Sequence, residues 1–178
     1  AEALLLPMDV SRKKSLVDIA LNLATSSGAS YCDVRIGRYL QQSIITRESK
    51  VQSIVSSESI GAGIRVLVKG AWGFAATSDL TATGIGNAVQ QAMLIANSNA
   101  KIQTQPVQLA KAPALGVVSW ATPIKINAMA IPVKEKADLL LSVNAAAMNA
   151  GANFVNSQLF LVNEQKYFAS TDGSYVDQ

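Results

Sequence analysis

Side chains that could carry out catalysis are scarce in this sequence. Its 178 residues include no histidine and one cysteine, Cys32. Neither a Ser-His-Asp triad nor a Cys-His pair can therefore form. Zinc sites nearly always use histidine or several cysteines, which this chain cannot supply. The 12 acidic residues are scattered, without the clustering that hard metal ions need. We expect no catalytic residue, no metal site and no cofactor in this chain.

The single cysteine lies in 31-YCDVRI-36, where the pattern alternates as in a β-strand. A nucleophilic cysteine needs a neighbouring base, and no histidine is present to act as one. We therefore expect Cys32 to pack in a core or on a pleat.

The stretch 61-GAGIRVLVKGAWGFAAT-77 contains the strongest candidates for a binding site. A phosphate-binding glycine loop is followed by the first turn of a helix, which receives the anion. Here Gly61 and Gly63 precede an alternating strand pattern instead, so the nucleotide-binding interpretation is rejected. We expect these glycines to mark a bulge or a close approach of another backbone.

Arg65 and Trp72 are the two candidate substrate-contact residues in this stretch. Arg65 alternates with Ile64 and Val66, so it should point away from the core. Trp72 follows the Lys69-Gly70 turn and is flanked by small residues. Two interpretations of Trp72 remain open at this point: a packed aromatic of a hairpin, or an exposed residue that contacts substrate.

The elements that position these residues are three helices and a series of short strands. Helices are expected over 11–28, where Ser11 caps the start and Gly28 ends it, over 79–99 with Asp79 as the cap, and over 132–151. Strands are expected at about 31–38, 40–47, 50–57, 61–69, 72–77, 153–162 and 165–171, with at most a short strand near 115–120 in an irregular segment from 100 to 131. The fold class is α+β: a mostly antiparallel sheet with amphipathic helices packed on it.

Two parts of the chain resemble each other at an offset of 123 residues. The segment 10-VSRKKSLVDIALNLATSSGASY-31 aligns with 133-VKEKADLLLSVNAAAMNAGANF-154. The aligned positions include Lys13 with Lys136 and Gly28 with Gly151. We predict two related helix-hairpin blocks that share one sheet, although chance similarity of two amphipathic helices is the alternative.

The segments 28-GASYCDVRI-36, 44-IITRESKVQSIVSSES-59 and 61-GAGIRVLVKGAWGFAATSDLT-81 together resemble the N-terminal domain of the TldD/PmbA family. The residues that match the family pattern are Asp33, Arg35, Arg47, Gly61, Gly63, Arg65, Gly70, Trp72, Gly73, Phe74 and Thr77. Two departures are Gln52, where the family has an acid, and the Glu48-Ser49 turn, where it has an Asn-Gly-like pair. The match is strongest over about 28–98.

The resemblance implies a function that the composition does not show. TldD/PmbA proteins are zinc metallopeptidases that have also been described as modulators of DNA gyrase. They act as homo- or heterodimers that enclose a channel for unfolded peptides. A C-terminal domain holds the zinc through a His-Glu-x-x-x-His motif and a cysteine. No such motif occurs in this sequence, so we expect residues 1–178 to be one non-catalytic N-terminal domain, with the metal domain absent.

The remaining expectations concern partners and location. The net charge is +3, without the basic patch and interleaved aromatics of a nucleic-acid interface. No apolar run approaches the roughly 20 residues of a membrane helix. We expect an unfolded peptide as partner, no direct contact with nucleic acid or membrane, and a cytoplasmic location, with export left open. The alternative function is a free-standing binding or structural module without peptidase activity.

Overall fold

The computed structural model describes residues 8–178, which divide into two compact units. The larger unit consists of residues 8–38, 60–121 and 165–178. The smaller unit consists of residues 39–59 and 122–164. Each unit is described by itself below.

The predicted α+β class is confirmed. The elements in chain order are α1 (Val10–Ser26), β1 (Tyr31–Arg47), β2 (Lys50–Val68), β3 (Ala71–Thr77), α2 (Ala82–Asn99), β4 (Gly116–Ser119), α3 (Val133–Asn149), β5 (Asn156–Ser170) and β6 (Ser174–Asp177). The strands form a sheet in the order β3-β2-β1-β5-β6-β4. The β2–β3 and β5–β6 pairs are antiparallel, and β4 pairs with β6 in parallel.

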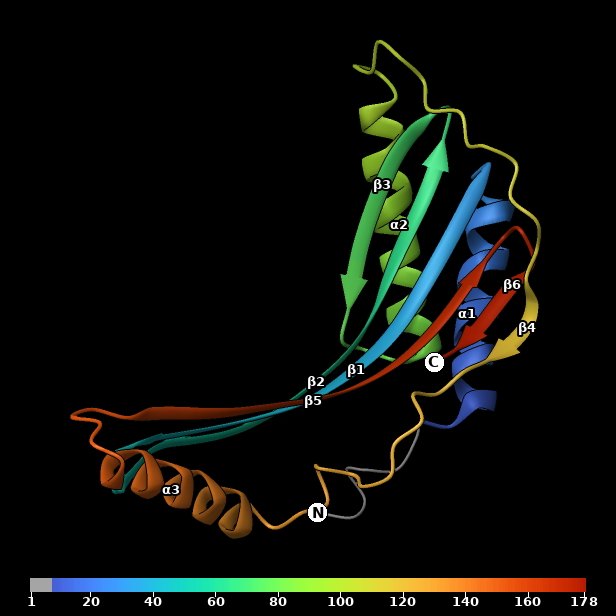
Figure 1. Cartoon of the computed structure of the whole chain (residues 1–178). Coiled ribbons are helices and arrows are strands. Elements are labelled where there is room, and N and C mark those ends of the chain that lie inside the picture. The colour runs from blue at the N-terminus through green and yellow to red at the C-terminus, as the bar shows by residue number, and fades with distance from the viewer. Residues whose placement is uncertain (1–7) are drawn as a thin grey trace. The chain divides into compact units, whose positions relative to one another are not determined.

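The core of the larger unit lies between its sheet and helices α1 and α2. Figure 1 shows both helices on the same side of these strands. Their apolar stripes, which include Val17 and Val89, pack against alternate strand residues such as Val34, Ile64 and Val66, all fully buried. Cys32 belongs to this core, as the alternation predicted. The opposite face of the sheet carries the residues in between.

The smaller unit has a smaller core and a buried polar network. Ile44 of β1 packs with Ala137 and Leu140 of α3. Asn144, fully buried, donates to Thr46 Oγ1 at 3.1 Å and accepts from Ser157 Oγ at 2.6 Å. These bonds satisfy the amide, which would otherwise be costly to bury.

Three strands are longer than predicted from the sequence. The expected breaks near residues 39, 59 and 163 do not occur, and β1, β2 and β5 run on through them for 17, 19 and 15 residues. Gly61 was expected at the start of a new strand, after one that ended near residue 57, but in the structure it lies inside β2. Serine and glycine are poor strand formers, yet backbone pairing along a neighbouring strand overrides that preference.

The helix caps also differ from the prediction. Asp9, and not Ser11, caps α1: its carboxylate accepts the Ser11 amide at 2.9 Å. Thr81, and not Asp79, caps α2, where its hydroxyl accepts the Gly84 amide at 3.1 Å. In both cases a second capping residue stood a few positions from the predicted one, and spacing alone does not choose between them.

The two related blocks have the same order of elements. Helix, long strand, turn and second strand follow one another as α1-β1-β2 and again as α3-β5-β6. Shifting α1 by 123 residues gives the bounds of α3, and shifting the end of β1 gives the end of β5. Both helices end in the same way: Gly28 and Gly151 have φ of +93° and +101°, and the next amides bond five residues back, Ala29 to Ala24 and Ala152 to Ala147.

Candidate functional site

Arg65 and Trp72 meet on the sheet face that is turned away from α1 and α2. The Arg65 guanidinium lies 4.5 Å above the Trp72 ring, within the range of a cation–π interaction. Its Nε and Nη2 donate to Asp33 Oδ2 at 2.9 and 2.6 Å. Tyr31 packs edge-on against Trp72, with 5.8 Å between ring centroids. We call Tyr31, Asp33, Arg65 and Trp72 the cation–aromatic cluster.

Burial and charge within the cluster fix its protonation states. The Asp33 side chain is 5% exposed, whereas that of Arg65 is 45% exposed. Burial, with the nearby Asp33 carboxylate, raises the pKa of Tyr31 to about 12. Partial burial lowers the pKa of Arg65, but hydrogen bonding and charge from Asp33 outweigh it and raise the pKa overall. The cluster therefore presents a fixed cation and two aromatic rings at neutral pH.

Further aromatic residues extend the same face. Phe74, 59% exposed, is paired with Arg65 across the β2–β3 hairpin. Its ring lies over Gly63, where an added Cβ would be 3.2 Å from the ring. On β5, the Phe168 ring lies 5.6 Å below the Arg35 guanidinium. The face thus offers rings and cations over several strands, which suits an extended chain with varied side chains.

The backbone of β3 adds a second mode of contact. This strand forms one edge of the sheet, next to β2 only. Because Lys69-Gly70 is a two-residue turn, Val68 and Ala71 form the first backbone hydrogen-bonded pair of the hairpin. Hydrogen-bonded and non-hydrogen-bonded pairs alternate along antiparallel strands, so the N–H and C=O groups of Trp72 and Phe74 point away from β2. Asn99 Nδ2 already donates to the Trp72 carbonyl at 2.8 Å. The outward-directed groups of Phe74 lie beside its exposed ring, where a peptide strand could add.

The family-pattern glycines serve packing and turn geometry. Gly70 follows Lys69 in the predicted turn, and both have positive φ, of +76° and +50°. A Cβ on Gly73 would be 2.0 Å from the Ala92 carbonyl oxygen, so only glycine lets α2 approach β3 this closely. A Cβ on Gly61 would be 3.0 Å from the Thr77 carbonyl. The close backbone approach expected at Gly61 and Gly63 is therefore found at Gly61, whereas Gly63 lies against the Phe74 ring.

Two other pattern residues lie outside the cluster. Thr77 ends β3 and accepts the Asp79 amide through Oγ1 at 3.0 Å, which shapes the turn into α2. Arg47 belongs to the smaller unit, at the end of β1, where its Nε is 3.3 Å from Glu48 Oε1. Arg47 is exposed and its role in this structure is that of a turn residue.

Sequence reasoning missed Tyr31 and Phe168 as members of this face. The alternation of β1 places Tyr31, Asp33 and Arg35 on one side of the strand, which was a usable signal. Phe168 comes from a segment more than 130 residues further on, and only the pairing of β5 with β1 brings it to Arg35.

The described part of the chain holds no recognisable catalytic apparatus. Burial raises the pKa of the Cys32 thiol to about 12, so this cysteine is a neutral core residue at pH 7. Residues 8–178 contain no group of three or more histidine, cysteine or acidic side chains placed to hold a metal ion. Among the helices described, none is both long and apolar enough to span a membrane. The rings and the cation of the open face are suited to binding.

Comparison with known proteins agrees with the sequence resemblance. Residues 32–96 match the family model of PmbA/TldA metallopeptidase domain 1. None of the curated protein sequences matches the chain.

Solved structures extend the comparison to nearly the whole chain. A proposed modulator of a DNA gyrase from Thermotoga maritima superposes with a TM-score of 0.73 at 17% identity, over 93% of this chain and 36% of its own. A proposed DNA gyrase modulator from Bacteroides thetaiotaomicron gives 0.63 at 17% identity, over 96% and 39%. TldE from Thermococcus kodakarensis gives 0.64 at 13% identity, over 92% and 36%.

These structural matches establish a shared fold, and the chain spans between 36% and 39% of the length of the three proteins. The family model covers most of β1, all of β2 and β3 and most of α2, and it includes every residue of the cation–aromatic cluster except Tyr31. Residues 32–96 therefore match the first domain of the PmbA/TldD family, in agreement with the sequence resemblance.

Proposed function

We propose that this chain is the non-catalytic N-terminal part of a TldD/PmbA-like metallopeptidase, and that the open face of its larger unit lines the channel for unfolded peptide substrates. The observation that carries this proposal is the cation–aromatic cluster, an ion-paired Arg65 stacked on Trp72 beside a free strand edge. The parent protein would act as a homo- or heterodimer, with its zinc in a C-terminal domain.

An extended peptide has the chemistry that this face accepts. Its backbone can pair with the outward groups of β3, and its side chains can rest on Trp72 and Phe74. Rings bind many side chains without strict selection. A surface of this kind therefore favours unfolded chains of varied sequence over one defined ligand.

Peptide contact is tested with two variants. Asp33→Asn combined with Arg65→Gln removes both charges together, because Arg65→Ala alone would leave the buried Asp33 unpaired. Trp72→Ala removes the ring, and Trp120→Ala is its control: Trp120 is 55% exposed and follows β4, at the opposite end of the strand order. We expect both test variants to weaken peptide binding to this chain about ten-fold, since a buried aromatic or charged contact contributes about 1–2 kcal/mol.

Binding is measured by titrating an unstructured peptide while following the backbone amide resonances of β3, Ala71–Thr77, which every variant retains. The same variants in the full-length protein should reduce peptide turnover, whereas Trp120→Ala should not. Normal turnover in all three, with chain stability intact, would assign the cluster to packing. Binding without any effect on turnover in the parent protein would favour the alternative, a free-standing binding module.

A second prediction concerns the isolated chain. With no histidine and one buried cysteine, purified protein should contain far less than one equivalent of zinc and should not cleave a fluorogenic unfolded peptide. Elemental analysis and the cleavage assay decide this. Stoichiometric zinc, or cleavage that a chelator abolishes, would contradict the proposal.

A further inference from the structure

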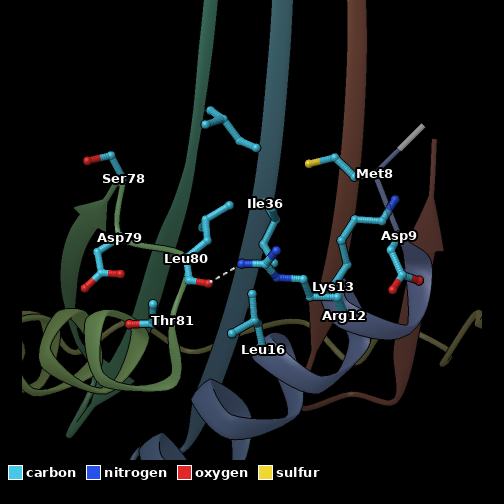
Figure 2. Close-up of a pocket in the computed structure, with 11 residues that line it drawn as sticks. Met8, Asp9, Arg12, Lys13, Leu16, Ile36, Ser78, Asp79, Leu80 and Thr81 are labelled. Carbon is cyan, nitrogen blue, oxygen red and sulfur yellow. Dashed lines mark hydrogen bonds between the residues drawn. The ribbon is translucent and has the colours of Figure 1, made fainter. Parts of the chain in front are cut away.

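A cavity of 430 Å³ opens in the larger unit, near the start of α1 and the segment that leads into α2 (Figure 2). The residues that form its walls come from α1, β1, β2 and residues 78–81. Leu16 and Ile36 of its lining also belong to the core beneath the helices, so the cavity lies on the helix side of the sheet. Arg65 and Trp72 occupy the other side, and the cavity is a separate site.

The walls of the cavity are mainly apolar. Met8, Leu16, Ile36, Ile60 and Leu80 contribute hydrophobic side chains. Ile60 is 41% exposed, whereas Ala62 and Ile64, the next residues on the same face of the strand, are buried. The volume falls within the range of roughly 300–1,000 Å³ typical of small-molecule sites. An apolar ligand body of a few carbon atoms would fit these walls.

Two of the four charged residues in the lining, Asp9 and Lys13, already have partners, and a third, Asp79, lies just before the start of α2. Asp9 accepts the Ser11 amide at the start of α1. The Asp79 carboxyl carbon lies 2.5 Å from where a Cβ on Gly84 would stand, against the first turn of α2. Lys13 Nζ is 2.5 Å from Asp177 Oδ1. Asp9 and Asp79 thus lie at the N-terminal ends of α1 and α2, where the helix dipole is positive. The charge of Lys13 is balanced by the Asp177 carboxylate.

Arg12 is the fourth, and its binding capacity is largely unused. Its Nη2 donates one long hydrogen bond, 3.3 Å, to the neutral Leu80 carbonyl. Figure 2 shows the side chain extending from α1 toward that carbonyl. Within residues 8–178 it forms no ion pair with an acidic side chain. A guanidinium has five N–H donors in a planar fork that matches a carboxylate.

We propose that this cavity binds an aliphatic carboxylate, with the carboxylate on Arg12 and the hydrocarbon between Leu16, Ile36 and Ile60. The Arg12 guanidinium would prefer a carboxylate to a neutral head group, and the apolar walls would hold the hydrocarbon. A free aliphatic acid and the C-terminus of an apolar peptide both present this chemistry. The site does not depend on peptide binding by the open face.

The test uses the 178-residue chain and two acids, hexanoate and N-acetyl-leucyl-leucine, each compared with its own amide. Amide resonances of residues 12–16 and 78–81 report binding, and titration gives the affinity. Arg12→Gln removes the cation, and Lys14→Gln is the matched control, because Lys14 lies on the same helix and pairs with Asp18 outside the cavity. Thermal unfolding verifies that both variants fold.

We expect at least one acid to bind at least about ten-fold more tightly than its amide, since a hydrogen bond between two charged groups is stronger than one to a neutral group. Arg12→Gln should remove this preference and Lys14→Gln should keep it. Hexanoate binding alone identifies a free acid as the ligand class, and binding of the acetylated dipeptide alone identifies a peptide C-terminus. Equal affinity for acids and amides, an unchanged preference in Arg12→Gln, or no binding up to about 10 mM would overturn the proposal.

Discussion

Replacing Gly73 by alanine is expected to lower the free energy of unfolding of the larger unit by about 3 kcal/mol or more. The new Cβ would be 2.0 Å from the Ala92 carbonyl oxygen and 2.6 Å from the Ala96 amide nitrogen. Both atoms belong to the backbone of α2, so no side-chain rotation relieves the clash. The helix must move away from β3, and the core residues beneath it, such as Val89, lose contacts.

Gly86 provides the matched control for this substitution. It lies in α2, and a Cβ there would meet only Leu23 Cδ2, at 3.9 Å. Glycine inside a helix costs about 0.5–1 kcal/mol relative to alanine. Gly86→Ala should therefore stabilise the chain slightly while Gly73→Ala destabilises it strongly. Urea unfolding followed by circular dichroism measures both, and a Gly73→Ala chain as stable as the original would contradict the packing of α2 on β3.

The local chemistry of the sequence predicted the Lys69-Gly70 turn and the end of α1 at Gly28, although not the residues that cap the starts of α1 and α2. Lys69-Gly70 and Gly28 were identified because glycine accepts positive φ at little cost, and the structure has positive φ at all three residues. The direction of Arg65 followed from alternation, since Ile64 and Val66 are buried and Arg65 is not. These features depend on a few neighbouring residues.

Strand length could not be predicted in the same way. The strands β1, β2 and β5 each pass through a point where the sequence indicated a break. Those points lie close to the boundaries between the two units, at residues 38–39, 59–60 and 164–165. Burial still alternates there in β1 and β5, but inward positions carry polar residues such as Arg38 and Asn163, so the apolar alternation of the sequence is interrupted. Apolar alternation therefore does not show where a strand ends, because backbone pairing continues past polar residues.

The partners of the candidate residues were also out of reach. Arg65 and Asp33 are 32 residues apart, and only the pairing of β1 with β2 brings them within 2.6 Å. The surroundings of Trp72 have features of both interpretations, a packed aromatic and an exposed contact residue. The Trp72 ring packs against Tyr31 and under Arg65, and it remains partly exposed. Pairing between distant strands is set by the whole sheet, and alternation in one strand does not contain it.

Two buried lysines at equivalent positions of the repeat are expected to respond in opposite directions to substitution. Lys13 is 5% exposed and Lys136 is 4% exposed. Lys13 pairs with the Asp177 carboxylate at 2.5 Å, whereas Lys136 Nζ donates to the neutral Gln42 Oε1 at 2.7 Å. Burial lowers the pKa of Lys136 from its ordinary value. The buried charge of Lys13 therefore has an opposite charge beside it, whereas the buried charge of Lys136 has only the neutral amide of Gln42.

Lys13→Met should lower the free energy of unfolding by about 2 kcal/mol, because Asp177 loses its counter-charge while it stays largely buried. Lys136→Met combined with Gln42→Leu should raise the free energy of unfolding by about 1 kcal/mol at pH 7, since both polar partners are replaced by apolar groups.

The pH dependence of stability tests whether burial of the charged Lys136 is the cause of that gain. The folded chain, with the lower pKa at Lys136, binds fewer protons than the unfolded chain in the window just below the ordinary lysine pKa. Stability therefore rises with pH across that window, and the advantage of the double variant should shrink there. Urea unfolding at pH 7 and pH 10 measures both effects, and a double variant less stable than the original at pH 7 would show that Lys136 contributes more through its hydrogen bond than its burial costs.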